Sequence, residues 1–365
     1  MLITIVAGAR PNFMKIAPII KSIQQAKANG ANIHFRLVHT GQHYDKKMSG
    51  DFFEQLGIPA PDINLECGGG TQAEQTAAIM IKFEKELTEN RPSAVLVVGD
   101  VTSTMACTIT AKKLCVDVVH VEAGIRSGDM TMPEEINRIV TDSICDHFFT
   151  TSEIANKNLL AHQAPASSIH FVGNTMIDTL YQNLDKVKQP LFWEAMRLQE
   201  NGYFLLTLHR PSNVDDGEKL KNILEAVNES AMDVPVLFPV HPRTKHMLDN
   251  LIFEKKNLLI IEPQGYLEFI YLVKNAKGII TDSGGITEEA TVLHIPCLTL
   301  RTSTERPETI ELGTNELIGD DLLKLKECVK EIMDEKWKKG SIPKFWDGKT
   351  SDRIVEKLIT IYNRN

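Results

Sequence analysis

The sequence predicts an α/β protein made of two doubly wound, parallel-sheet domains. Short apolar runs rich in valine and isoleucine alternate with longer segments of helical pattern, and this series starts twice along the chain. The runs are apolar at nearly every position, which is typical of strands covered on both faces. The length of 365 residues also favours two domains, at about 150 residues each.

The first series of strands lies in an expected N-terminal domain of residues 1–172. Crossover helices are expected between the strands, for example over 14–28 and 71–89, which is the order of a parallel sheet. The expected strands are 2–7, 34–39, 94–99, 117–121, 147–150 and 169–172.

The second series follows a polar segment and lies in an expected C-terminal domain of residues 173–350. The final segment, 351–365, is expected to form an amphipathic helix and is a candidate addition to the first domain. We expect the two domains to face each other across a central cleft. The expected strands are 203–208, 235–240, 258–261, 277–281 and 296–300.

Composition excludes several classes of protein. With 40 basic and 48 acidic residues the net charge is −8, so a nucleic-acid or membrane-surface partner is not expected. The six cysteines form no CxxC pair and are read as reduced thiols. No apolar run reaches the ~18–20 residues of a membrane span, and the start of the chain lacks a signal-peptide pattern. A cytoplasmic location is expected.

The segment TDSGGITEEA, residues 281–290, is the clearest local motif. Ligands of open parallel sheets bind beyond the carboxyl ends of strands, and here a strand runs directly into a helix. Ser283, Gly284 and Gly285 would leave the first helical N–H groups open to phosphate, and a glutamate one turn later could accept hydrogen bonds from ribose. The alternative is a serine N-cap with nothing bound.

Basic residues follow the first expected strand. Arg10 and Lys15 flank its turn, and with Arg306 they are candidates for holding an anionic substrate; surface charges at a helix start are the alternative. The turn has no GxGxxG pattern, so NAD is not expected, and the sequence predicts no cofactor.

Three carboxylates and two histidines complete the candidate set. Asp100, Glu122 and Glu134 could divide acid and base duties, although each alone could be a cap or an ion-pair partner. His209 and His241 each follow an apolar strand and precede basic residues, which favours contact with phosphate. No metal-ligand spacing is present, so no metal site is predicted.

Six motifs in order give the chain a resemblance to the non-hydrolysing UDP-N-acetylglucosamine 2-epimerases. They are GARPNFMKIAPI, VVGDVTSTMA, HVEAGIRSGD…PEEINR, TLHRPSN, DSGGITEEA and RTSTERPE. The resemblance implies a fold like that of GT-B glycosyltransferases and a homodimer. It also implies interconversion of UDP-GlcNAc and UDP-ManNAc, which would supply N-acetylmannosamine for surface polysaccharides.

The resemblance also implies roles for individual residues. Ser283, Gly284 and Gly285 would hold the diphosphate, Glu289 the ribose, and Arg306 the charged end, while Gln264 and Phe269 would lie by the uracil. Glu134 is a further acid or base candidate. Substrate contact or catalysis is implied for Arg10, Lys15, Asp100, Glu122 and His209.

Some members of this family have a second, activating substrate site. Its candidates here are Gln42, His43, Arg210 and His241. Asp45 stands where a second glutamine is usual, so activation by substrate stays open.

The implied reaction expels UDP from C1 to leave a 2-acetamidoglucal, and then adds UDP back after a proton returns to the opposite face of C2. A hydrolysing relative, which releases ManNAc and UDP, is the main alternative. A glycosyltransferase and a non-catalytic sugar-nucleotide sensor are the others.

Overall fold

The computed structural model describes residues 1–41, 53, 55–240, 242–249, 251–253 and 256–363. The chain forms two compact units. Unit 1 comprises Met1–Gln182 together with Lys344–Asn365, and unit 2 comprises Asn183–Pro343. The domain limits of 1–172 and 173–350 stay a prediction.

Unit 1 is built on a parallel sheet of seven strands in the order β3-β2-β1-β4-β5-β6-β7. The order reverses between β1 and β4, which are neighbours although β2 and β3 lie between them in sequence. The strands are β1 (Leu2–Ala7), β2 (His34–His39), β3 (Ile63–Asn64), β4 (Ala94–Val98), β5 (Asp117–Val121), β6 (His147–Thr150) and β7 (Ile169–Phe171).

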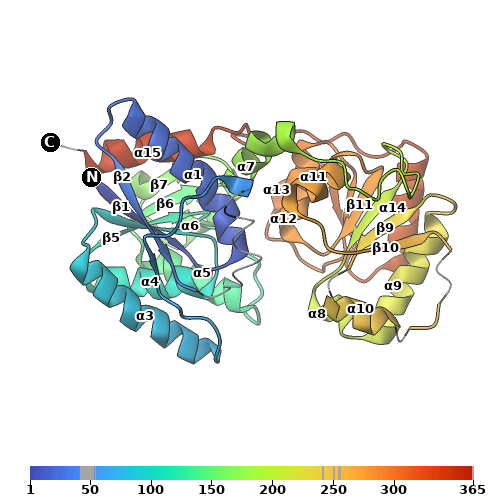
Figure 1. The fold of residues 1–365 in the computed structure, drawn as a ribbon, viewed down its shortest axis with the longest axis horizontal. Helices are drawn as coiled ribbons and strands as arrows, with labels where there is room; N and C mark the ends of the chain where they lie inside the picture. Colours follow the sequence, from blue (N-terminus) through green and yellow to red (C-terminus); the bar gives the residue numbers. More distant parts are fainter. Residues whose placement is uncertain (42–52, 54, 241, 250, 254–255, 364–365) are drawn as a thin grey trace. The chain divides into compact units, whose positions relative to one another are not determined.

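Helices cover both faces of this sheet (Figure 1). Helices α3, α4 and α5 pack side by side, while α1 packs against the C-terminal helix α15, where the Ser22 hydroxyl donates to Asp352 at 2.7 Å. The helices are α1 (Arg10–Ala28), α3 (Gln72–Glu89), α4 (Thr102–Lys113), α5 (Pro133–Ile144), α6 (Glu153–Ala161), α7 (Thr175–Asn183) and α15 (Thr350–Tyr362).

Unit 2 repeats the plan with six parallel strands in the order β10-β9-β8-β11-β12-β13, so its reversal lies between β8 and β11. The strands are β8 (Phe204–Thr207), β9 (Val236–Pro239), β10 (Leu258–Ile261), β11 (Gly278–Thr281), β12 (Cys297–Thr299) and β13 (Asn315–Leu317). The helices are α8 (Pro211–Val214), α9 (Gly217–Ser230), α10 (Pro242–Asp249), α11 (Tyr266–Lys274), α12 (Gly284–Val292), α13 (Pro307–Glu311) and α14 (Leu322–Met333).

The core of unit 2 explains why most of its strands are apolar at nearly every position. Phe204 and Leu206 of β8 pack into a cluster on one face of the sheet, whereas Tyr203 and Leu205 belong to the cluster on the other. Successive residues of a strand point to opposite faces, so a strand covered on both faces needs an uninterrupted apolar run. The prediction of two doubly wound parallel sheets is confirmed.

Among the described residues, none of the helices combines the length and the apolar character needed to cross a lipid bilayer.

Candidate functional site

In each unit, predicted site residues follow the two strands at which the strand order reverses. In unit 1, Arg10 and Lys15 come after β1, and Asp100 follows β4. In unit 2, His209 follows β8, and Ser283 begins the helix after β11. Such reversals open a crevice at the carboxyl edge of a doubly wound sheet, which is where ligands of this architecture bind.

Lys15 and Glu122 form a buried ion pair in unit 1. The Lys15 ammonium lies 2.7 Å from a carboxylate oxygen of Glu122, and both side chains are almost fully buried. Glu122 has φ +74, in the left-handed region that non-glycine residues rarely adopt. Gly99 has φ +65, a conformation that favours glycine, and a Cβ there would lie 2.8 Å from the Lys15 ammonium and force that end of the side chain to move.

Asp100 is held by the first turns of α5. Arg138 donates a hydrogen bond to the Asp100 carboxylate, and the Asn137 amide donates to its backbone oxygen at 2.8 Å. Arg138 also lies 3.2 Å from Glu135, which accepts the Ser127 N–H at 2.9 Å. Burial raises the pKa of Glu135, but these donors outweigh it and hold that pKa below its usual value. The sequence indicated Arg138 as a helix-start residue that positions Glu134, and its pairing with Asp100 was not predicted.

Glu134, the third predicted carboxylate, has a different environment. It is exposed in the first turn of α5, whereas its neighbour Glu135 is buried. Arg10 is likewise exposed, at the first position of α1. The structure of unit 1 therefore brings Lys15 and Glu122 into contact and leaves Arg10 and Glu134 open to solvent.

A second buried network supports the loops that carry Asp100 and Glu122. Asp142 lies 2.7 Å from His120 Nδ1 and accepts the Gly124 N–H at 3.0 Å, while His120 Nε2 lies 2.8 Å from the Gly99 oxygen. His120, Asp142 and Cys145 could together offer three metal ligands within 4.8 Å. Because the imidazole and the carboxylate already have protein partners, we interpret this group as a bridge between two loops.

In unit 2, the predicted phosphate site lies at the start of α12. Ser283 is the N-cap residue, but its side chain makes no capping hydrogen bond, so the capping alternative is not what the structure contains. A Cβ added at Gly285 would meet no described atom within 4 Å, so packing does not explain this glycine. A Cβ at Gly284 would lie 3.6 Å from the Arg301 guanidinium, which is therefore a close neighbour of the helix start.

The loops around this helix start carry charged side chains. Arg301 forms a 2.8 Å ion pair with Glu305, and Arg210 lies 4.0 Å from the same glutamate. His209 is exposed, and its Nδ1 lies 2.8 Å from the buried carboxylate of Asp282, the residue directly before Ser283. Neither Arg301 nor Asp282 was predicted as a site residue, although each directly follows an expected strand.

Further along α12, two glutamates are buried together. Glu288 pairs with the guanidinium of Arg306, and both side chains are buried. Burial and the neighbouring Glu288 raise the pKa of Glu289 to about 8. Burial, and then the nearby Glu289, also raises the pKa of the Tyr266 hydroxyl, so α11 and α12 meet at this group.

The two residues predicted to lie by the uracil are near the start of α11. Gln264 donates to the Glu262 backbone oxygen at 2.7 Å. Phe269 is half-buried and packs against the core of unit 2. Gln42, His43 and His241, three of the four candidates for a second substrate site, lie outside the described residues.

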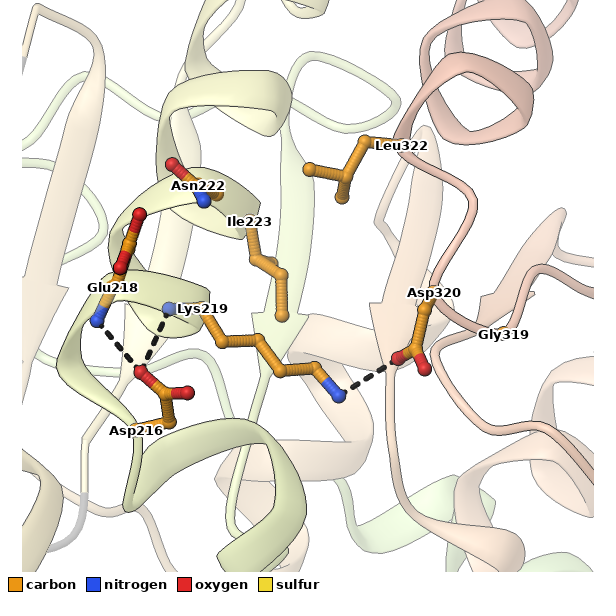
Figure 2. Close-up of a pocket in the computed structure, with 8 residues that line it drawn as sticks. All are labelled: Asp216, Glu218, Lys219, Asn222, Ile223, Gly319, Asp320 and Leu322. Carbon is orange, nitrogen blue, oxygen red and sulfur yellow. Dashed lines mark hydrogen bonds and ion pairs between the residues drawn. The ribbon is translucent and has the colours of Figure 1, made fainter.

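A separate hollow of about 380 Å³ lies in unit 2, at the start of α9 (Figure 2). Asp216 caps this helix, and the Lys219 ammonium lies 2.7 Å from Asp320 on the facing loop. The residues that line it are Asp216, Glu218, Lys219, Asn222, Ile223, Gly319, Asp320 and Leu322. None of these was predicted as a site residue.

The chain is similar to known proteins over nearly its whole length. Residues 25–359 match a family model described as UDP-N-acetylglucosamine 2-epimerase. The chain is 44% identical to the UDP-N-acetylglucosamine 2-epimerase of Methanocaldococcus jannaschii, over 98% of this chain and 99% of that protein. It is 38% identical to the UDP-2,3-diacetamido-2,3-dideoxy-D-glucuronate 2-epimerase of Pseudomonas aeruginosa, over 98% of this chain and 99% of that one.

A solved structure of such a relative matches the fold of this chain. The Methanocaldococcus jannaschii UDP-GlcNAc 2-epimerase, crystallised in complex with UDP-GlcNAc and UDP, matches with a TM-score of 0.86 at 44% sequence identity. The match covers 99% of this chain and 100% of that one. The predicted GT-B-like fold class is thereby confirmed.

Proposed function

We propose that this chain, which belongs to the UDP-N-acetylglucosamine 2-epimerase family, interconverts UDP-GlcNAc and UDP-ManNAc without hydrolysis. One observation carries the proposal beyond family membership. Carboxylates held by cations follow neighbouring strands of unit 1, and an open glycine helix start stands at the strand reversal of unit 2. The paired carboxylates are suited to proton transfer at a sugar, and the glycine helix start is suited to binding a diphosphate.

The proposed first step eliminates UDP. A carboxylate takes the C2 proton, the C2–H electron pair forms the C1–C2 double bond, and the C1–O bond breaks with its electrons moving to the diphosphate. We assign this proton transfer to Glu122, which pairs with Lys15, and to Asp100, which Arg138 holds in place. Glu134 is a further candidate.

The second step reverses the first on the other face. A protonated group returns a proton to the opposite face of C2, and the diphosphate oxygen attacks C1 to restore the nucleotide sugar. This requires UDP to stay bound while the glycal is present. We assign that task to the N–H groups at the start of α12, with Arg301 nearby and Arg306 at the charged end.

Isotope exchange in heavy water tests the proposal. Incubation with UDP-GlcNAc is expected to give UDP-ManNAc that carries deuterium at C2, with little free UDP. Epimer formed without deuterium would contradict the elimination. Free UDP in amounts equal to released ManNAc would instead support the hydrolysing alternative.

A second candidate substrate follows from the Pseudomonas aeruginosa relative, which is named for a 2,3-diacetamido-glucuronate sugar nucleotide. The same elimination would serve it, because the reacting atoms are again C1 and C2. Measuring kcat/KM for both sugar nucleotides under the same conditions decides between them. We expect the higher value for UDP-GlcNAc, in line with the 44% identical relative.

We also propose that the product enters surface polysaccharide synthesis and that the chain acts as a homodimer. An apolar hollow of about 610 Å³ on α3, α4 and α5 supports the dimer, since Met80, Met105 and Ile136 line it. Ile81 on the same helix group is 68% exposed. Light scattering of the purified protein is expected to give twice the chain mass, and Ile81→Glu is expected to shift it toward the monomer.

A further inference from the structure

We propose that Asp282 is a positioning residue, which fixes the imidazole of His209 so that its Nε2 faces the ligand held at the start of α12. The inference rests on the proposed function for the identity of that ligand, a nucleoside diphosphate sugar. It assigns to Asp282 a task that acts through His209, without contact between Asp282 and the substrate.

The geometry at Asp282 supports this role. Its side chain is fully buried, and its carboxylate lies 2.8 Å from His209 Nδ1. The same carboxylate accepts the backbone N–H of His209 at 3.1 Å and that of Arg210 at 3.0 Å. The Asn213 amide donates to it at 3.2 Å and also reaches the Leu300 oxygen. One carboxylate therefore fixes both the backbone and the ring of His209.

The protonation state of Asp282 agrees with the geometry. Burial by itself raises the pKa of the Asp282 carboxyl, but His209, the Arg210 N–H and Asn213 outweigh burial and leave that pKa below its usual value. An ionised carboxylate only accepts hydrogen bonds, so the ring nitrogen that faces it must carry the hydrogen. Nδ1 is thus the donor, and Nε2 is the nitrogen left for another partner.

Exposure distinguishes this pair from the other histidine–aspartate pair described above. The His120 side chain is fully buried, and its second nitrogen is already on the Gly99 oxygen, so that pair is structural. The His209 side chain is 58% exposed although its carboxylate partner is 0% exposed. The His209 ring is held on its buried side and is exposed to solvent on the other. Such a ring is suited to contact with a ligand, whereas a ring used for packing is covered.

Asp282 also lies next to the start of α12 in the sequence. Asp282 ends the loop after β11 and precedes Ser283, the N-cap of α12. The carboxylate that orients His209 therefore also anchors the backbone from which the α12 N–H groups project. With Nδ1 held by Asp282, a hydrogen on Nε2 would be placed to donate to the diphosphate as negative charge develops on it.

A double-mutant cycle tests the proposal through turnover. Asp282→Asn keeps the shape and one acceptor oxygen for the backbone N–H groups but removes the negative charge. We expect it to lower kcat at least about tenfold in the wild-type background and less than about twofold in a His209→Gln background. Equal losses in the two backgrounds would show that Asp282 acts through the fold alone and would overturn the proposal.

Nitrogen-15 NMR of the histidine rings gives a readout that does not depend on epimerase activity. We expect His209 of the resting wild-type protein to carry its hydrogen on Nδ1, and Asp282→Asn to shift it toward the Nε2–H form. A wild-type His209 already protonated on Nε2 alone would overturn the inference. If the chain lacked epimerase activity, this measurement would still decide the role of Asp282, so the two failures are distinguishable.

Discussion

The Lys15 ammonium lies 2.7 Å from the Glu122 carboxylate, and both groups are buried at the carboxyl edge of the unit 1 sheet. A buried ion pair is weak evidence for stability, because the cost of removing two charges from water offsets their attraction. Glu122 also has a left-handed backbone conformation, which costs further free energy. A buried ion pair and a strained backbone at the end of a strand are typical of a functional site.

Lys15→Met is expected to lower the free energy of unfolding by about 3–5 kcal/mol, since it leaves the Glu122 carboxylate buried without its partner. Turnover should fall with it. Lys85→Met is the matched control, because Lys85 and Glu89 are 3.8 Å apart and largely exposed. It should cost less than about 0.5 kcal/mol in the same denaturant titration. A stable and active Lys15→Met protein would remove Glu122 from the proposed mechanism.

Asp100→Asn is expected to reduce kcat by about 10²-fold or more while UDP affinity stays within about twofold, because it removes a proton acceptor and no diphosphate contact. Steady-state kinetics and calorimetric titration with UDP measure the two effects. Asp320→Asn, in the hollow of unit 2, serves as a control that should change neither. Near-normal turnover of Asp100→Asn would exclude the proton-transfer role.

Gly285→Ala is expected to weaken UDP binding at least about tenfold without loss of stability. The new methyl group meets no described protein atom within 4 Å and would instead occupy space that the diphosphate needs. Gly313→Ala is the contrasting variant, since its Cβ would lie 2.5 Å from the Thr309 oxygen and should cost about 1–3 kcal/mol of stability. Unchanged UDP affinity in Gly285→Ala would place the diphosphate elsewhere.

Glu289 should make stability depend on pH. Its pKa is raised from 4.5 to about 8 in the folded chain by burial and by Glu288. Between these pH values the folded state keeps a proton that the unfolded state releases, so the free energy of unfolding falls as pH rises through this window. In Glu289→Gln this contribution is absent. Chemical unfolding of both proteins at pH 5 and pH 8 is expected to show a smaller decrease for the variant.

Arg306→Met is expected to destabilise unit 2, because it leaves Glu288 buried without its guanidinium partner. It should also weaken UDP binding if Arg306 holds the charged end of the substrate. The double variant Glu288→Met/Arg306→Met separates the two effects. We expect it to recover stability but not UDP affinity; recovery of both would make Arg306 a partner of Glu288 only.

Local sequence pattern was enough for most of the fold. The strand at 117–121 is evident because consecutive valines suit a strand buried on both faces. Strands β3 (Ile63–Asn64) and β13 (Asn315–Leu317) were missed, because they are two or three residues long and partly polar. Such short segments become strands only through pairing with a neighbour that the sheet supplies.

The site residues show a different limit. Ser283 and Gly284 could be predicted because a glycine pair at a strand end is a local signal. The pairing of Arg138 with Asp100 was not predicted, because the two residues are 38 apart in sequence and no local pattern links an arginine inside a helix to a strand end. Whether a charged residue lies on the surface or in the site depends on its pairing with residues of other elements, and residue type alone does not show this.

The C-terminal helix has a consequence for how the polypeptide is made. Unit 2 is one continuous segment, whereas α15 belongs to unit 1 and is anchored there by Asp178, which accepts the Thr350 and Ser351 N–H groups. A ribosome therefore delivers all of unit 2 before unit 1 receives its last helix. Until translation reaches that helix, the part of α1 that packs against α15 stays uncovered, so the first part to be synthesised is the last to be completed.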